Sequence, residues 1–434
     1  MQIENERGIS FYSSADIVRF LDTVMVYGVY LYALTMFNPH VVALHSIGMY
    51  LPLLCWLIKH AITRGRLLGY FRNSVSVMVF AFAMIVLLSV VHSPDMFYSL
   101  DRFRRGLGSM LFLFVVTADV FRDERKLLHL AAMLAFGGLI MMLLDMYQYY
   151  HEFVIRLYAN LSMRDSKVDL STMHRWYSES LLYLVPFMLF MAIQRRGKPA
   201  FFWWLVFMVD AVLLFVTGAR GPWVGFSAAI VVWSLVKADK KLLLLSAAGM
   251  LALSTLAFVL AAKDPGANLI ASRFKQGLQT GRINAIWRPT DEMILDKPLT
   301  GYGVGRQIYY NEFNRRAAVS SWWPYKKAQG THSNYMQIAF AAGVPALLVF
   351  VFMYARVFAT LWKLSRISRS PPQANIALVT LMSFTGHYMV RGSVENLPWI
   401  PLGILLGITV ALVMIDKAGS PAQGRKEGNV KPES

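Results

Sequence analysis

The chain has 434 residues, of which 56% are hydrophobic and 16% are charged, whereas a soluble chain carries roughly a quarter charged residues. This composition excludes a disordered or fibrous protein and indicates a membrane protein that crosses the bilayer many times. The net charge is +18, from 43 basic and 25 acidic residues. The single cysteine, Cys55, excludes a disulfide within the chain and a cysteine-rich zinc site.

Apolar stretches of sufficient length recur along the chain, since a transmembrane helix takes about 20 residues. They lie near residues 18–37, 40–59, 74–92, 106–121, 127–147, 176–194, 200–217, 222–236, 242–262, 334–360, 375–391 and 398–416. We therefore predict an all-α integral membrane protein of about twelve transmembrane helices. The predicted parts are helices 1–9 (residues 1–262), a large loop (263–331), helices 10–12 (332–417) and a tail (418–434).

The predicted orientation follows from the short connections, because cytoplasmic loops are enriched in lysine and arginine. Basic clusters such as residues 122–126, 195–198 and 237–241 fall on one side, so we expect both termini to be cytoplasmic. The first apolar run lacks a cleavage site and is expected to be retained. The outward loop 263–331 carries eleven basic against five acidic residues. This excess indicates an anionic partner, or contact with lipid headgroups.

Arg220 is the first candidate for the site. It lies in Thr217-Gly218-Ala219-Arg220-Gly221-Pro222-Trp223, between predicted helices seven and eight, and Pro222 suits the first turn of a helix. Free backbone amides and the helix dipole favour an anion there, and a guanidinium adds a bidentate fork for phosphate. The alternative is an interfacial arginine that snorkels to the membrane surface.

The outward loop contains a second basic segment with a helical period. Apolar residues at Ile283, Ile286, Trp287, Met293 and Ile294 predict an amphipathic helix from about residue 282 to 296, with Arg282 at its start. The following Gly-Tyr-Gly-Val-Gly run (301–305) lacks the lysine and serine or threonine of a nucleotide site. It therefore predicts a tight turn at the membrane surface.

His332 opens the tenth predicted helix at the outward face. A helix dipole disfavours imidazolium at that position, so we expect a low pKa and a neutral ring that can accept a proton. This makes His332 a candidate general base, although a lone histidine is often structural or simply solvated.

Acidic residues offer little support for a metal site. The outward segments hold no Asp-x-Asp pair, and neighbouring positions such as Asp291 and Glu292 are expected to face different ways on a helix. No metal or other cofactor is therefore expected, and arginines would have to take the place of a cation. Asp210, inside the seventh predicted helix, is expected to form an internal hydrogen bond. Glu395 and Arg391 either border the site or pair with each other.

Taken together, these motifs resemble the O-antigen ligase family within the wider group of lipid-linked glycan ligases and polymerases. The segments that carry the resemblance are T-G-A-R-G-P-W (217–223), G-R-I-N-A-I-W (281–287), K-P-L-T-G-Y-G-V-G (297–305) and H-S-N-Y-M (332–336). Ala219 and Ser333 stand where relatives often have serine and asparagine. The resemblance extends over essentially the whole chain, with its specific motifs between residues 217 and 335.

The resemblance implies a metal-independent, inverting GT-C-type glycosyltransferase of the bacterial inner membrane, with its large loop in the periplasm. It would transfer O-antigen from an undecaprenyl pyrophosphate-linked glycan donor to a sugar hydroxyl of a lipid A-core acceptor. Its partners would include membrane lipids and no nucleic acid. The implied catalytic residues are His332, Arg220 and Arg282. Candidate substrate-binding residues are Arg288, Tyr302, Asn334, Tyr335 and Trp287.

Three other functions remain open from the sequence. An O-antigen polymerase or a protein O-oligosaccharyltransferase could use the same donor. Protein-directed relatives tend to be longer at the carboxyl end, which favours a lipid acceptor here. A lipid-linked oligosaccharide flippase is the alternative from another class, but the sequence shows no clear sign of repeat-related halves or of charged or broken helices at mid-membrane.

Overall fold

The computed structural model describes residues 14–64, 72–162, 174–216, 219–238, 244, 282–368 and 370–419. These residues form helices and connecting turns, with no β-strand among them. In chain order the elements are α1 (Ser14–Thr35), α2 (Val42–Thr63), α4 (Ser74–Val91), α5 (Met96–Phe103), η1 (Arg104–Gly108), α6 (Ser109–Val120), α7 (Glu124–Ser162), α8 (His174–Gln194), α9 (Lys198–Val216), α10 (Arg220–Lys237), η2 (Ile283–Trp287), α14 (Arg288–Asp296), α15 (Arg306–Val319), α16 (Asn334–Ile367), α17 (Pro371–Ser383), η3 (Phe384–Val390), η4 (Arg391–Ser393) and α18 (Leu402–Gly419).

The all-helical, multi-pass character predicted from the sequence is confirmed. In the described part of the chain, α1, α2, α4, the first 25 residues of α7, and α16 are long and apolar enough to cross a membrane. Helices also lie at the other predicted stretches, except 242–262, which falls outside the described residues apart from residue 244. The number of twelve transmembrane helices, the GT-C fold and the orientation of the chain in the membrane stay predictions.

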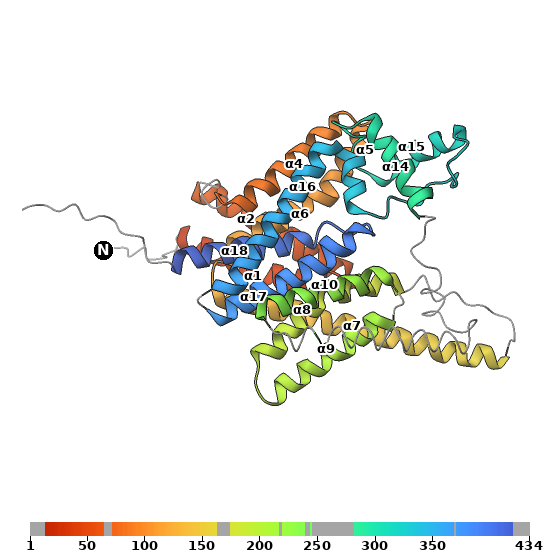
Figure 1. Cartoon of the computed structure of the whole chain (residues 1–434). Coiled ribbons are helices and arrows are strands. Elements are labelled where there is room, and N and C mark those ends of the chain that lie inside the picture. The colour runs from red at the N-terminus through yellow and green to blue at the C-terminus, as the bar shows by residue number, and fades with distance from the viewer. Residues whose placement is uncertain are drawn as a thin grey trace, which may run out of the picture.

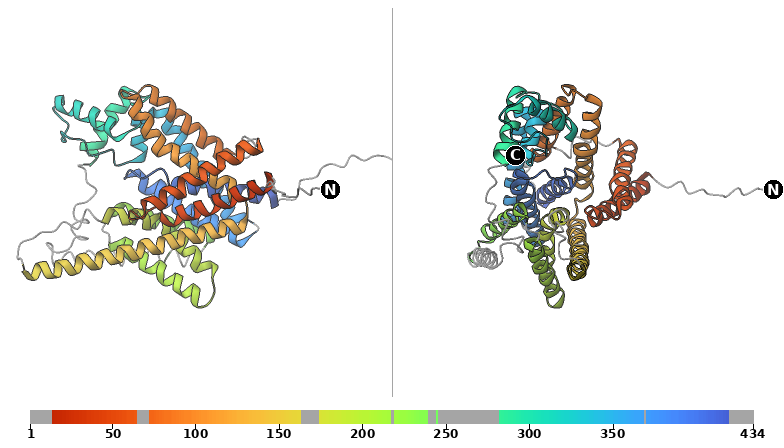
Figure 2. Two further views of the ribbon diagram at one scale, coloured as in Figure 1. Left: turned by 180° about the vertical axis from the view of Figure 1, so that it is seen from behind. Right: turned by 90° about the vertical axis from the view of Figure 1, so that its right-hand side faces the viewer.

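The long helices form one bundle, and the short helices α5, α14 and α15 gather beyond one of its ends (Figure 1). Figure 1 shows α5, α14 and α15 together past the ends of α4 and α16. Figure 2 shows the same grouping from behind, with α7 extending past the bundle at the same end. Within the bundle, α1 packs on α2, α6 on α18, α4 on α16 and α7 on α8.

The bundle surface is apolar where a bilayer would surround it. On α9, the side chains of Phe201, Leu205, Met208 and Val212 are each more than half exposed, while Asp210 is fully buried. In water such a face would be costly, so it indicates contact with lipid. The expected internal hydrogen bond of Asp210 is absent among the described residues, because neither carboxylate oxygen has a partner there.

An ion-pair cluster joins the last turn of α6 to neighbouring helices. The Lys59 ammonium on α2 lies 2.7 Å from the Asp22 carboxylate on α1 and 3.2 Å from that of Asp119 on α6. Arg122 also pairs with Asp119, which is largely buried. A buried carboxylate needs such partners because desolvation is expensive when its charge is left uncompensated.

Helix α16 is broken near its amino-terminal end, a feature that was not predicted from the sequence. Gly343 has a φ of 78° and a ψ of 178°, which are not helical, and Pro345 inside the helix cannot donate a backbone hydrogen bond. The break divides α16 into a short first part, residues 334–342, and a long second part. Within a membrane protein, the backbone groups freed by such a break need other partners.

The Lys-Pro-Leu-Thr-Gly-Tyr-Gly segment supplies those partners. Its backbone pairs with α16 through three hydrogen bonds: Tyr302 N to Phe340 O (2.9 Å), Gly303 N to Ala341 O (2.8 Å) and Val344 N to Pro298 O (2.7 Å). The glycine run is thus a tight turn, as predicted, but it is packed against a broken helix. It fixes the first part of α16 relative to α14 and α15, which flank the segment in the chain.

Gly301 is the position in this turn that least tolerates a side chain. Its φ is +64°, and an added Cβ would lie 2.4 Å from the Ala341 carbonyl carbon. Gly197 has nearly the same φ, +63°, but nothing lies within 4 Å of its Cβ position. The two glycines therefore share the same backbone strain and differ in available space.

We expect Gly301→Ala to lower the thermal unfolding midpoint of the detergent-purified protein much more than Gly197→Ala. Both variants bear about 1 kcal/mol of left-handed backbone strain, and Gly301→Ala adds about 1–3 kcal/mol because the backbone of α16 must move. Thermal unfolding followed by size-exclusion chromatography measures both midpoints. Equal shifts would contradict the close packing of this turn.

Candidate active site

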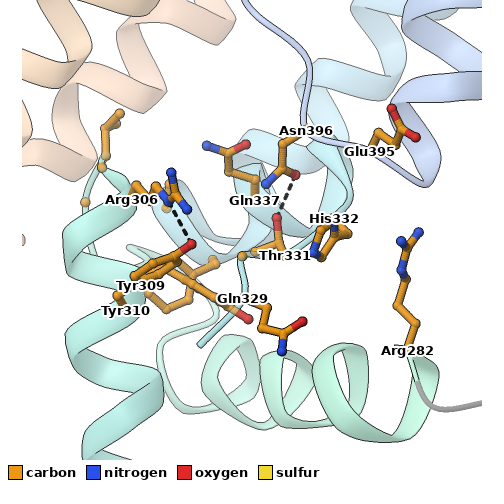
Figure 3. A pocket seen from close by; sticks show the side chains of 16 residues that line it. Arg282, Arg306, Tyr309, Tyr310, Gln329, Thr331, His332, Gln337, Glu395 and Asn396 are labelled. Atoms are coloured by element: carbon orange, nitrogen blue, oxygen red, sulfur yellow. Dashed lines mark hydrogen bonds between the residues drawn. The ribbon is translucent and has the colours of Figure 1, made fainter. Parts of the chain in front are cut away.

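A cavity of about 360 Å³ lies between α15, the residue before η2 and the start of α16. Its walls come from the start of η2, the turn before α15, the segment before α16 and the loop after η4. Figure 3 shows that Arg282 and His332, from segments far apart in the sequence, both extend into this space. The structure therefore brings these two predicted site residues together.

The backbone at His332 is held in an unusual conformation. His332 has a φ of +50°, in the left-handed region that a residue with a Cβ rarely adopts. It precedes Ser333, the N-cap of α16, whose side chain accepts a hydrogen bond from the Met336 amide. His332 thus lies just outside the helix that it was predicted to open. Left-handed residues of this kind persist only where their surroundings impose them.

Asn396 and Trp287 supply that constraint. The Asn396 side-chain oxygen accepts hydrogen bonds from the Thr331 hydroxyl and from the Ser333 amide, both at 2.8 Å. The Trp287 indole N–H donates to the Thr331 carbonyl at 3.1 Å. Both neighbours of His332 are therefore fixed, and the imidazole is held at the cavity wall.

Arg282 is positioned by the loop that follows η4. Its guanidinium donates a hydrogen bond of 3.0 Å to the Val394 carbonyl. The next residue, Glu395, lines the cavity and pairs at 2.7 Å with the guanidinium of Arg391, which is fully buried. Both possibilities left open for Glu395 therefore hold, because it borders the cavity and also pairs with Arg391.

Arg220 is the first residue of α10, as predicted, after the N-cap Ala219. Its neighbour Gly221 lies so close to the Glu395 carboxylate that an added Cβ would be 3.1 Å from Oε1. Gly225, one turn further, packs against the backbone of Gly386 in η3, where its Cβ would lie 2.5 Å from the Gly386 carbonyl oxygen. The amino end of α10 is thus held beside a residue that lines the cavity.

Two of the five predicted substrate-binding residues lie next to the cavity without lining it. Trp287 holds the Thr331 backbone, as described above. Asn334 is fully buried, and its side-chain oxygen accepts a hydrogen bond of 2.9 Å from the Leu397 amide. Trp287 therefore connects η2 to the segment before His332, and Asn334 connects α16 to the segment that follows Asn396.

Tyr302 and Tyr335 have structural partners. The Tyr302 hydroxyl donates to Asp296 at 2.8 Å, and its ring stacks on Phe340 at 4.9 Å between centroids. Burial, followed by the hydrogen bond to Asp296, raises the pKa of Tyr302. The Tyr335 hydroxyl donates to the Met389 carbonyl at 3.2 Å. Neither tyrosine lines the cavity.

Arg288 lies in a separate, open surface hollow of about 390 Å³, together with Asp291, Glu292 and Trp322. The prediction that Asp291 and Glu292 face different ways is wrong in this respect, since both line the hollow. They can do so because positions 288, 291 and 292 share one exposed face of α14. Among the described residues, no three histidine, cysteine or carboxylate side chains gather as metal ligands would.

The cavity also contains residues that the sequence analysis missed. Asn396 is the most important, since it bonds to both neighbours of His332. Arg306 and Tyr310 line the cavity on the side of His332 away from Arg282 (Figure 3), and Gln329 and Gln337 also line it. Arg306 directly follows the predicted glycine turn, and this was the one sequence signal that could have pointed to it.

We expect Asn396→Ala to lower kcat about tenfold while the protein stays folded. Loss of the side chain leaves the Ser333 amide without its acceptor, at a cost of about 1–3 kcal/mol for a buried group. The Thr331 hydroxyl keeps its bond of 3.1 Å to the Ser333 carbonyl but loses the one to Asn396, so His332 is held less firmly. Asn396→Asp keeps an acceptor oxygen and should retain more activity than the alanine variant. Steady-state transfer rates measure this effect.

Asn311→Ala is the matched control, because the exposed Asn311 side chain bonds only to Gln307 on the same helix among the described residues. A kcat for Asn396→Ala equal to that of Asn311→Ala would contradict the positioning of His332 by Asn396.

These features define a multi-pass helical membrane protein with a basic, histidine-containing cavity at one end of its bundle. The family model described as O-antigen ligase matches residues 203–351, a segment that contains Arg220, Arg282 and His332. An O-antigen ligase from Salmonella typhimurium is 26% identical over 349 residues, which cover 79% of this chain and 84% of the relative.

Both matches support the resemblance read from the motifs, since each is a similarity of this chain to O-antigen ligases. Homology to this family implies an enzyme of the glycosyltransferase type.

Proposed function

We propose that this chain is an O-antigen ligase that joins an undecaprenyl pyrophosphate-linked glycan to a sugar hydroxyl of lipid A-core oligosaccharide. The reaction takes place at the periplasmic face of the bacterial inner membrane, with both termini in the cytoplasm. The observation that carries this proposal is the convergence of Arg282 and His332 on one cavity, beside the amino end of α10.

The proposed donor end of the cavity suits a diphosphate. Arg282 provides a planar guanidinium, and α10 begins with Arg220 and with backbone amides that a helix start leaves available for an anion. Arginine forms bidentate hydrogen bonds with phosphate more readily than lysine does. The polyprenyl tail of such a donor would lie in the surrounding lipid.

The proposed reaction is a single displacement. The His332 imidazole takes the proton of the acceptor hydroxyl, and the hydroxyl oxygen forms a bond with the anomeric carbon of the donor. The bond between that carbon and the phosphate oxygen breaks, and undecaprenyl pyrophosphate leaves with the electron pair. Arg282 and Arg220 stabilise the negative charge on the departing phosphate, in the place of a divalent cation. One displacement inverts the anomeric configuration.

Reconstitution tests this function directly. Purified protein is incubated with undecaprenyl pyrophosphate-linked glycan and rough lipopolysaccharide, with and without EDTA. We expect glycan-bearing lipopolysaccharide to form at the same rate in both samples. Inhibition by EDTA that Mg²⁺ reverses would refute the replacement of a cation by arginines. Glycan found on another glycan, on protein, or only moved across vesicles would indicate a polymerase, a protein-directed transferase or a flippase.

A further inference from the structure

The cavity has two ends, and His332 lies between them. Figure 3 shows Arg282 and Glu395 on one side of His332, and Arg306 with Tyr310 on the other. Both ends contain an arginine, but the proposed function so far uses only the first. A transferase must hold two substrates, with its base between the bond to be broken and the hydroxyl that attacks.

The second end is built around a fixed guanidinium. The Arg306 Nε donates a hydrogen bond of 2.7 Å to the Tyr310 hydroxyl, and the guanidinium carbon lies 4.8 Å from the centre of the Tyr310 ring. These contacts within α15 direct Arg306 along the cavity wall. This hydrogen bond comes from Nε. It therefore orients the two terminal nitrogens of the Arg306 guanidinium without using their own N–H groups.

Two amide side chains of the cavity suit sugar hydroxyls. Gln329, in the segment before His332, and Gln337, on the first part of α16, both line the cavity. An amide side chain offers donors and an acceptor together, which matches a hydroxyl that also acts as both. Two amides, a phenol and an arginine around a cavity of about 360 Å³ fit a sugar ring with an anionic substituent.

We propose that the Arg306 end of the cavity binds the acceptor glycan, with Arg306 on a phosphate or carboxylate substituent and Gln329 and Gln337 on hydroxyls. This inference rests on the proposed function and assigns the second substrate to a place in the same cavity. It puts two anionic groups at separate arginines, one on each side of His332. The acceptor hydroxyl then lies next to the imidazole that takes its proton.

The basic surface continues from this end onto α5. The Tyr98 hydroxyl accepts a hydrogen bond of 3.1 Å from the backbone N–H of Gln307, the residue after Arg306. The Arg102 guanidinium lies 4.9 Å from the centre of the Tyr98 ring. A longer acceptor with more than one anionic group can therefore extend from Arg306 towards Arg102.

Steady-state kinetics with each substrate varied in turn separates the two ends. We expect Arg306→Ala to raise the KM for rough lipopolysaccharide about 10- to 100-fold, the effect of losing a hydrogen bond to a charged group. The KM for the undecaprenyl pyrophosphate-linked glycan should change less than about twofold. Arg315→Ala is the control, because Arg315 is an exposed arginine on the same helix that pairs with Glu312.

A raised donor KM with an unchanged acceptor KM would overturn the proposal. If Arg306→Ala does not fold, Gln329→Ala serves as the second variant, with a smaller rise in acceptor KM. A wild-type protein that transfers no glycan would refute the proposed function itself. Active wild type with unaltered acceptor KM in both variants would refute this inference alone.

Dephosphorylated lipopolysaccharide tests the assigned contact. Removing the phosphates should raise the acceptor KM of the wild type about as much as Arg306→Ala does, and should have little further effect on that variant. An equal rise in wild type and variant would show that Arg306 does not contact the anionic substituent.

Discussion

His332→Asn is expected to lower kcat for glycan transfer about 10²- to 10⁴-fold, the usual effect of losing a general base. Asparagine is chosen because, like histidine, it tolerates the left-handed backbone found at this position better than most residues. Its amide cannot accept the proton of the acceptor hydroxyl. The variant should therefore fold and bind both substrates, and fail at the chemical step.

Single-turnover transfer with purified protein measures this effect, with the thermal unfolding midpoint as a check on folding. His92→Asn is the matched control, since His92 is an exposed histidine at the end of α4, outside the cavity. A folded His332→Asn protein with wild-type kcat would remove His332 from the reaction. The loss of activity in His92→Asn as well would point to a general effect on stability.

Arg282→Lys is expected to lower kcat about 10²- to 10³-fold, close to the effect of Arg282→Ala. A stabilising donor aimed at a developing charge contributes about 2.7–4 kcal/mol. Lysine keeps the charge but has no planar fork, so it cannot bond to the Val394 carbonyl and to a phosphate in the geometry of a guanidinium. Initial rates at saturating donor and acceptor measure the effect.

The control for this variant is Arg315→Lys. Arg315 is exposed, lies outside the cavity and forms an ion pair with Glu312 on its own helix. It should keep wild-type kcat. Wild-type rates in Arg282→Lys would show that charge alone suffices at this position. Such a result would leave the bidentate role to Arg220, where the corresponding lysine variant would then be the decisive one.

Hydrophobic length and helical period predicted the long helices and the helix at 282–296, because burial in lipid or in protein depends on those patterns. The short helices α5 and α15 were not predicted. The helix predicted at 282–296 is present as η2 and α14, although its first turn is a π-helix. The break in α16 was missed, since Gly343 and Pro345 lie in a continuous apolar run. Its stability depends on hydrogen bonds from residues 298–303, a pairing that no local pattern encodes.

Site residues could be predicted only where a reactive or charged side chain stands in a distinctive sequence motif. Arg282 and His332 stand in distinctive segments, and both line the cavity. Asn396 lies more than sixty residues further along the chain, and its importance comes from two hydrogen bonds formed only in the folded protein. Tyr302 and Tyr335 show the opposite case, because aromatic residues inside the motifs turned out to have structural partners.

The most direct test of the account is the position of the diphosphate in a cryo-electron microscopy structure of the protein bound to undecaprenyl pyrophosphate. We expect phosphate oxygens within hydrogen-bond distance of the Arg282 guanidinium and of the amino end of α10, on the Glu395 side of His332. A diphosphate in the Arg288 hollow, at Arg306, or held by a metal ion would contradict it.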